Sequence, residues 1–143
     1  MADRNIVYIA LGSNLGEREK FLSAAREAIA ALPGTRFIAQ TPVEETAAIG
    51  PVKQGSFLNQ MVAVETGLEP EDLMAQLQQI EERGGRVRGT RWGPRTIDLD
   101  IVAIEGQAIS SPGLVVPHPE LPNREFWLRE LAFLRQCAAR PAD

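Results

Sequence analysis

Two aspartates separated by one residue are the most chemically suggestive feature of the sequence. Asp98 and Asp100 lie in the run TIDLDI (residues 96–101), in which apolar and polar residues alternate. Such alternation predicts a strand with both carboxylates on one face and about 6.6–7 Å between their Cα atoms. Carboxylates at that separation can hold two hard cations about 3.5–4 Å apart, and oxygen ligands favour Mg²⁺. A solvated polar strand face is the simpler alternative.

A dense group of arginines precedes this pair. Residues 83–95 read RGGRVRGTRWGPR and contain five arginines and no acidic residue. The planar guanidinium suits bidentate contact with phosphate, and phosphoryl transfer depends mainly on positioning and charge neutralisation. Carboxylates and arginines together point to Mg²⁺-dependent phosphate or nucleotide chemistry. A solvated loop that offsets an acidic surface is the alternative for the arginines.

Other standard sites have weaker support. The sequence contains neither a Walker A pattern nor G-x-G-x-x-G. One cysteine and one histidine argue against a zinc site, and no nucleophile motif surrounds His118. Residues 12–14 (GSN) fit a structural turn and cap better than an anion site. The prolines on both sides of His118 fix its backbone, which leaves binding and structural roles equally open.

The composition is that of a folded globular chain. With 143 residues, 44% hydrophobic and 24% charged, it predicts a single domain over 1–143. The single cysteine, Cys137, excludes an internal disulfide and fits a reducing compartment. No apolar run approaches the roughly 18 residues of a membrane span, and residues 1–5 do not resemble a signal peptide. We therefore expect a cytoplasmic protein without membrane association.

The charge distribution argues against a nucleic-acid partner. The net charge is −4, from 15 basic and 19 acidic residues. Setting aside the five arginines of residues 83–95 leaves a charge of −9 on the rest of the chain. An acidic protein with one dense arginine segment suggests a local anion site, because a surface for polymeric DNA needs broad positive charge.

The periodicity predicts the elements that must position these residues. Strands are expected at 6–11, 36–40, 57–65 and 96–104, and helices at 17–32, 70–83 and 126–135. Residues 41–56 are expected to be a long functional loop, and residues 107–116 to pair back or run along an edge. The β-α-β-β-α-β order predicts an α+β, ferredoxin-like fold. Its sheet would be antiparallel with both helices on one face, followed by a C-terminal extension.

Residues 85–88 (GRVR) and 91–100 (RWGPRTIDLD) closely resemble the signature of the 6-hydroxymethyl-7,8-dihydropterin pyrophosphokinase family of the folate pathway. Further matching segments lie in the family's order, and the resemblance runs from about Ile6 to Leu134. It implies the same ferredoxin-like fold. These segments are Leu11–Gly16, Gly50-Pro51, Phe57-Leu58-Asn59, Ile80-Glu81, Val116-Pro117-His118 and Asn123-Arg124 with Phe126.

The resemblance implies an enzyme that transfers diphosphate from ATP to the hydroxymethyl oxygen of the pterin and releases AMP. Asp98 and Asp100 would hold two Mg²⁺ ions. Arg86 and Arg95 would contact the phosphates and stabilise the developing charge. The partners would be the two substrates, and we expect a monomer.

The resemblance assigns further residues to the two substrates. Phe57 and Phe126 would sandwich the pterin, Asn59 would bind its polar edge, and Trp92 would cover it. The full pterin set is Thr46, Ile49, Phe57, Asn59, Trp92 and Phe126. The ATP set is Gln78, Glu81, Arg88, Ile101, His118 and Arg124. The residues Glu44-Glu45 before Thr46 replace the aromatic residue usual at this point in the family.

Two other functions remain open at this stage. A non-catalytic nucleotide-binding relative could keep the scaffold without turnover, and the altered segment before Thr46 is the feature that supports it. An RNA-binding module shares the β-α-β-β-α-β order. Such a module needs exposed aromatics on its central strands and broad positive charge, which this sequence does not show.

Overall fold

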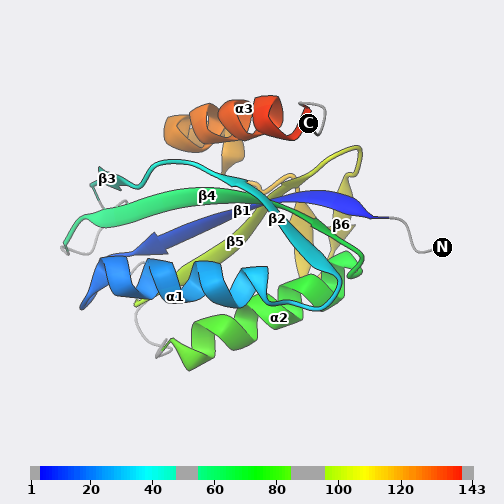
Figure 1. The fold of residues 1–143 in the computed structure, drawn as a ribbon. Helices are drawn as coiled ribbons and strands as arrows, with labels where there is room; N and C mark the ends of the chain where they lie inside the picture. Colours follow the sequence, from blue (N-terminus) through cyan, green and yellow to red (C-terminus); the bar gives the residue numbers. More distant parts are fainter. Residues whose placement is uncertain (1–3, 48–54, 85–95, 140–143) are drawn as a thin grey trace.

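The computed structural model describes residues 4–47, 55–84 and 96–139 (Figure 1). Helices and strands alternate along these residues much as the sequence pattern predicts. In chain order the elements are β1 (Asn5–Ser13), α1 (Arg18–Ala30), β2 (Thr35–Gln40), β3 (Glu44–Thr46), β4 (Phe57–Thr66), α2 (Pro70–Arg83), β5 (Asp98–Ile104), β6 (Ile109–Ser111), β7 (Leu114–Val116), the 3₁₀ turn η1 (Leu121–Asn123) and α3 (Glu125–Ala139).

The main sheet is antiparallel, with strand order β2-β4-β1-β5. This is the order of a ferredoxin-like fold, so the predicted fold class is confirmed. β3 pairs with residues 57–59 at the start of β4, whereas β2 pairs with residues 62–66 of the same strand. The expectation of a loop throughout 41–56 was therefore wrong, because the segment returns to the sheet edge for three residues.

The two faces of the sheet carry separate hydrophobic cores. α1 and α2 cover one face, as predicted, and α3 lies across the other (Figure 1). Leu22, Ile29 and Leu77 pack on the first face, while Trp127 and Leu131 pack on the second. The C-terminal extension is thus a helix of 15 residues, longer than the predicted 126–135.

The sequence of α2 shows why the helix forms where it does. Pro70 occupies its first turn, where a missing N–H costs nothing, and Glu71 and Asp72 follow it at the positive end of the helix dipole. Its predicted apolar stripe is fully or nearly fully buried. That stripe consists of Leu73, Leu77 and Ile80.

Two other expectations need correction. Residues 107–116 form a separate hairpin of β6 and β7, joined to the end of β5 by a single bridge between Ile104 and Gln107. The last strand of the main sheet begins at Asp98, two residues later than expected.

In the part of the chain that the structure describes, no helix is long and apolar enough to cross a membrane.

α3 leaves part of its face of the sheet uncovered. Its buried residues pack over Tyr8, Ala10 and Met61. Past the N-terminal end of α3, toward Gly12 and the start of β5, the same face of the sheet contains a pocket. The pocket therefore lies where the covering helix ends.

Candidate active site

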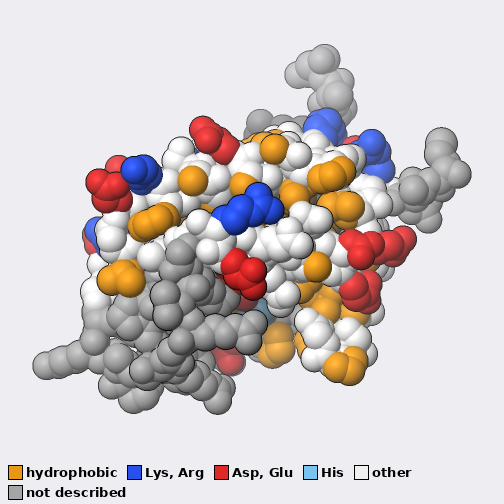
Figure 2. Space-filling model, turned by 90° about the horizontal axis from the view of Figure 1, so that it is seen from below, with side chains coloured by type: hydrophobic (Ala, Val, Ile, Leu, Met, Phe, Trp, Pro, Cys, Tyr) orange, Lys and Arg blue, Asp and Glu red, His pale blue; other side chains and the backbone are white. Residues whose placement is uncertain are grey.

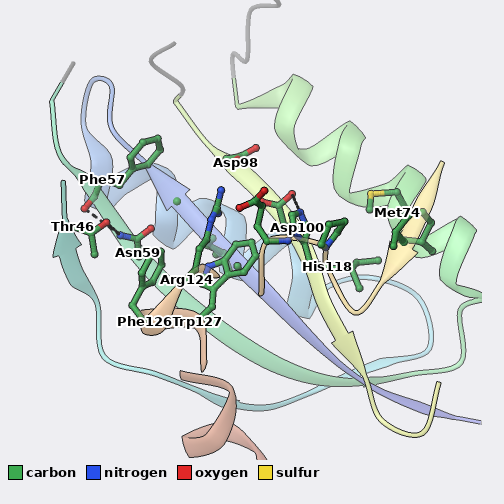
Figure 3. A pocket seen from close by; sticks show the side chains of 18 of the residues that line it. Thr46, Phe57, Asn59, Met74, Asp98, Asp100, His118, Arg124, Phe126 and Trp127 are labelled. Carbon is green, nitrogen blue, oxygen red and sulfur yellow. Dashed lines mark hydrogen bonds and ion pairs between the residues drawn. The ribbon is translucent and has the colours of Figure 1, made fainter. Parts of the chain in front are cut away.

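The pocket has a volume of about 570 Å³ and draws residues from both cores and from the β6–β7 hairpin (Figure 3). A cavity of this size accommodates a small-molecule ligand. Its lining is mixed, with charged groups and aromatic rings as well as aliphatic ones. The described lining residues are Ala10, Leu11, Gly12, Thr46, Ala47, Phe57, Asn59, Met74, Asp98, Asp100, Ile101, Pro112, Gly113, Leu114, Val115, His118, Pro119, Glu120, Arg124, Phe126 and Trp127.

The floor of the pocket is a row of paired residues across three strands. Gly12 in β1 lies opposite Asn59 in β4 on one side and opposite Asp98 in β5 on the other. Paired side chains point to the same face of a sheet, and two strand spacings separate the outer members by about 10 Å. A Cβ at Gly12 would lie 3.3 Å from Cδ1 of Phe57. The glycine therefore keeps the space between the amide and the carboxylate open.

Asp98 and Asp100 both line the pocket, on either side of the buried Leu99. The strand alternation thus places the two carboxylates on one face, as the sequence predicts. Mg²⁺ commonly binds one or two carboxylates and takes its other ligands from substrate phosphates and water. A pair of aspartates in an open polar cavity fits that donor set.

His118 is fixed beside Asp100 by three contacts. Its backbone N–H donates to the Val102 carbonyl at 2.8 Å, and its Nδ1 accepts from the Glu120 N–H at 3.0 Å. The ring packs edge-on against Trp127, with centroids 4.9 Å apart. Because Nδ1 is an acceptor, the neutral ring carries its proton on Nε2, which faces Asp100 Oδ1 at 3.7 Å.

Arg124 brings a positive charge into the same end of the pocket. Its guanidinium lies 4.3 Å from the centre of the Trp127 ring, a cation–π contact that restrains the side chain. It lines the pocket together with His118 and the two aspartates (Figure 3). This end can hold cations through its carboxylates and anions through Arg124, which is the combination that a metal-bound phosphate needs.

The opposite end of the pocket is aromatic, with one buried amide. Asn59 is 8% exposed, and its Nδ2 donates to Thr46 Oγ1 at 2.5 Å. Phe57 and Phe126 enter from β4 and α3, on either side of Asn59 (Figure 3). Two rings around a hydrogen-bonding amide suit a flat heterocycle with a polar edge.

Comparison with known proteins finds a family model that matches this chain. The family model for 7,8-dihydro-6-hydroxymethylpterin-pyrophosphokinase matches residues 8–136. The chain belongs to this family. A model match over most of the chain confirms the resemblance carried by the GRVR and RWGPRTIDLD segments.

Curated relatives of the pyrophosphokinase family agree with the family model. The 2-amino-4-hydroxy-6-hydroxymethyldihydropteridine pyrophosphokinase of Pseudomonas aeruginosa is 46% identical over 90% of this chain and 79% of that protein. The protein of the same name from Bacillus subtilis is 43% identical over 96% of this chain and 83% of its own length. That from Methylorubrum extorquens is 43% identical over 87% and 79% respectively.

Most of the described residues that the pyrophosphokinase resemblance selects are brought together by the fold. The first and last members, Thr46 and Phe126, lie 80 residues apart in sequence, so only the tertiary structure assembles the set. The residues that line the pocket are Thr46, Phe57, Asn59, Asp98, Asp100, Ile101, His118, Arg124 and Phe126. The predicted residues Ile49, Arg86, Arg88, Trp92 and Arg95 lie outside the described residues.

Two residues assigned to ATP are not part of this lining. Gln78 is exposed on α2. Glu81 is only 4% exposed, and its Oε2 accepts a hydrogen bond from the Leu99 N–H at 2.8 Å. The bond ties α2 to the strand that carries the two aspartates, which gives Glu81 a structural contact at the site. The assignment of both residues to the nucleotide stays a prediction.

Other lining residues were missed by the sequence reasoning. Met74 adjoins the buried stripe of α2 and reads as a core residue, although it reaches the pocket. Trp127 supports both His118 and Arg124. Its place three residues after Arg124, one helical turn away, is the signal that could have found it.

The segment Gly12–Asn14 has a structural role on the pocket floor and beside it. Gly12 supplies the open floor, and Asn14 Nδ2 donates to the Gly55 carbonyl at 3.1 Å. The expected cap was wrong, because the N-cap residue of α1 is Glu17, which makes no side-chain capping bond.

Proposed function

We propose that this chain transfers the β,γ-diphosphate of ATP to 6-hydroxymethyl-7,8-dihydropterin, giving AMP and the pterin diphosphate for folate biosynthesis. Membership of the pyrophosphokinase family supports the reaction class. The single observation that carries the proposal is the row Asn59–Gly12–Asp98, which joins an aromatic end to a carboxylate end across one open floor.

The aromatic end suits the pterin. A planar ring between Phe57 and Phe126 would place its polar edge against Asn59, whose amide is already oriented by Thr46. The hydroxymethyl group would then point along the floor over Gly12, toward Asp98. The acceptor oxygen therefore approaches the charged end of the pocket.

The carboxylate end suits the triphosphate. Asp98 and Asp100 would hold two Mg²⁺ ions, which when bound would neutralise phosphate charge. Arg124 and the Nε2 proton of His118 would contact phosphate oxygens, and Ile101 and Met74 offer apolar surface for the nucleoside. The acceptor hydroxyl loses its proton to solvent as its oxygen forms a bond to the β-phosphorus. The bond from that phosphorus to the α,β-bridging oxygen breaks, and AMP leaves with the bridging oxygen.

The remaining predicted residues complete the proposal from the sequence. Arg86 and Arg95 would contact the phosphates, and Arg88 would reach ATP from the same arginine-rich segment. Ile49 and Trp92 would contact the pterin. These assignments rest on the family signature in the sequence.

The test is AMP release from ATP and Mg²⁺ with and without the pterin, in the wild-type chain and in Asp98→Asn and Asp100→Asn variants. We expect AMP only when the pterin is present. Each substitution removes a carboxylate charge, so turnover should fall at least about 100-fold. Asp72→Asn, which changes an exposed acid in the first turn of α2, is the matched control and should retain wild-type turnover.

Each alternative predicts a different result. A folded chain that binds ATP but releases no AMP would be a non-catalytic relative. Near-normal turnover in both aspartate variants would contradict the metal assignment. Affinity for RNA that falls steeply with salt and needs no Mg²⁺ would support the RNA-binding alternative.

The described surface on the side of α1 and α2 does not favour the RNA-binding alternative. Acidic and basic side chains are interspersed among the described residues there (Figure 2), whereas such a module needs broad positive charge.

We further propose that the chain acts as one domain, as a monomer and in the cytoplasm. A length of 143 residues fits a single domain. The use of ATP as co-substrate fits the cytoplasm, which supplies ATP.

A further inference from the structure

The short strand β3 brings Thr46 into the aromatic end of the pocket, at the edge of the sheet. It pairs with β4 over three residues, from Glu44 opposite Asn59 to Thr46 opposite Phe57. Three residues of edge strand rich in glutamate have low intrinsic strand preference. Contacts other than backbone pairing must therefore hold this strand in place.

One contact comes from the helix on the pocket side of the sheet. Alternation along β3 puts Glu44 and Thr46 on the same face, and both are partly buried. Arg129 of α3 donates two hydrogen bonds to Glu44, from Nη2 to Oε1 at 3.0 Å and from Nη1 to Oε2 at 3.3 Å. This paired geometry is the stronger and more directional form of an arginine–carboxylate contact.

The other contact comes from the opposite face. Glu45 points away from Thr46, toward α1, where Arg18 Nη1 lies 3.0 Å from Glu45 Oε2. The same Nη1 is 3.0 Å from the Ser56 carbonyl, and the Ser56 hydroxyl donates to Glu45. Arg18 thus joins β3 to the residue that precedes β4.

The chain leading into β3 is fixed independently. Thr41 is 4% exposed; its hydroxyl donates to Glu130 Oε2 and accepts from the Met61 N–H. Gln60 donates to the Thr41 carbonyl at 2.6 Å. The segment is therefore fixed at Thr41, and beyond it the two ion pairs and the Ser56 hydroxyl hold Glu44 and Glu45.

We propose that Arg18 and Arg129 are positioning residues for the pterin site. By holding β3 from both faces, they keep the Thr46 hydroxyl where it accepts the Asn59 amide proton, and so fix the orientation of that amide. The assignment rests on the proposed role of Asn59 in binding the pterin. It also gives Glu44 and Glu45 a function in the segment where this sequence departs from the usual family pattern.

A charge exchange between Arg129 and Glu44 tests the proposal. The variants are Arg129→Glu, Glu44→Arg and the double variant that restores the pair with its charges reversed. We expect each single change to raise KM for the pterin about three- to tenfold, with KM for ATP unchanged. The double variant should recover most of the lost affinity, and Arg18→Gln should raise KM for the pterin in the same direction.

A matched control and a measurement independent of turnover complete the test. Arg135→Glu breaks another ion pair of α3, with Glu105 at 2.7 Å, and should leave both KM values unchanged. Hydrogen exchange at the amides of residues 44–46 should be faster in the single variants and return toward the wild-type rate in the double variant.

The results that would overturn the assignment are specific. Equal increases in KM for both substrates would indicate a general loss of structure. Single variants with the same KM values as Arg135→Glu would show that the two ion pairs do not hold β3. Either result, in an enzyme that still releases AMP, would refute the positioning role and leave the proposed function intact. A wild-type chain that releases no AMP with the pterin removes the proposed function, and the assignment with it.

Discussion

Glu130 places a carboxyl group inside the core between α3 and the sheet, away from the pocket. The residue is 6% exposed, and its Oε2 accepts from the Thr41 hydroxyl at 3.1 Å. The pKa of Glu130 is raised to about 7, chiefly by burial and also by the charge on Glu44, while Thr41 and Arg129 act against the rise. Within the described residues Oε1 has no hydrogen-bond partner. A charged carboxylate is therefore disfavoured at this position.

We expect the stability of the native chain to reflect this carboxyl group. The pKa of Glu130 is higher in the native state than its ordinary value of 4.5, so the native chain binds the proton more tightly. Its contribution to stability is complete below about pH 4.5 and is lost as the pH rises through about 7. Glu130→Gln should therefore be more stable than wild type at pH 8, by about 1–3 kcal/mol, and equal to it near pH 4.5.

Urea unfolding of both proteins from pH 4.5 to pH 8 measures this difference. Glu27→Gln, at an exposed position of α1, is the control and should follow the wild-type curve. Parallel curves for Glu130→Gln and wild type would show that Glu130 keeps an ordinary pKa.

Some site residues could be predicted from their own neighbours and others could not. The shared face of Asp98 and Asp100 follows from alternation over six residues, which is a local property. The opposition of Asn59, Gly12 and Asp98 depends on the register of three strands that lie far apart in the sequence. No local pattern specifies that register, so the floor of the pocket appears only in the structure.

At the scale of elements, the end of α2 is fitted closely to the residue just before β5. Gly84 terminates the helix, and a Cβ on it would lie 2.7 Å from Cγ2 of Ile97. Ile97 immediately precedes Asp98, and Glu81 accepts a hydrogen bond from the N–H of Leu99, which follows Asp98. The helix end therefore helps to set where the aspartate strand begins.

Gly84→Ala should consequently destabilise the chain by about 1–3 kcal/mol, because the new methyl group must displace Ile97 or the helix end. Chemical unfolding gives the difference directly. Gly67→Ala is the matched control, since a Cβ there meets nothing within 4 Å, and it should change stability by no more than about 0.5 kcal/mol. Equal stabilities for the two variants would mean that the contact between Gly84 and Ile97 relaxes freely.

Elements with a strong local period were predicted, and elements held by distant partners were not. The apolar stripes of α1 and α2 and the apolar runs of β1 and β4 identify themselves. β3 has no such pattern, because Glu-Glu-Thr becomes a strand only through pairing with β4 and the charges of Arg18 and Arg129. The β6–β7 hairpin is similar, since its three-residue strands pair only with each other in the described sheets.

At the scale of the whole molecule, the described residues form one main sheet with a core on each face, a separate β6–β7 hairpin, and a pocket where the helix α3 ends. Residues of the pocket come from β1, β3, β4, β5, α2, the β6–β7 hairpin and the start of α3. A ligand in the pocket thus contacts elements from both cores at once. Binding to the native chain alone must stabilise the whole fold.

ATP with Mg²⁺ should therefore raise the melting temperature. At about 100 times its Kd, such a ligand adds about 2.7 kcal/mol, which corresponds to a rise of roughly 5–10 °C for a chain of this size. Scanning calorimetry with ATP and Mg²⁺, and again with excess EDTA, measures the effect. Chelation should remove most of the rise, and Asp100→Asn should show little of it. A rise unaffected by EDTA would contradict metal-dependent nucleotide binding.

The row Asn59–Gly12–Asp98 also constrains inhibitors. The distance between its ends is set by backbone hydrogen bonding between strands, which side-chain substitutions do not change. A compound that links a pterin-like head to a phosphate-like tail would have its linker length dictated by two strand spacings. Resistance substitutions could weaken the binding of such a compound at either end of the pocket. They could not lengthen the distance between Asn59 and Asp98 that the linker spans.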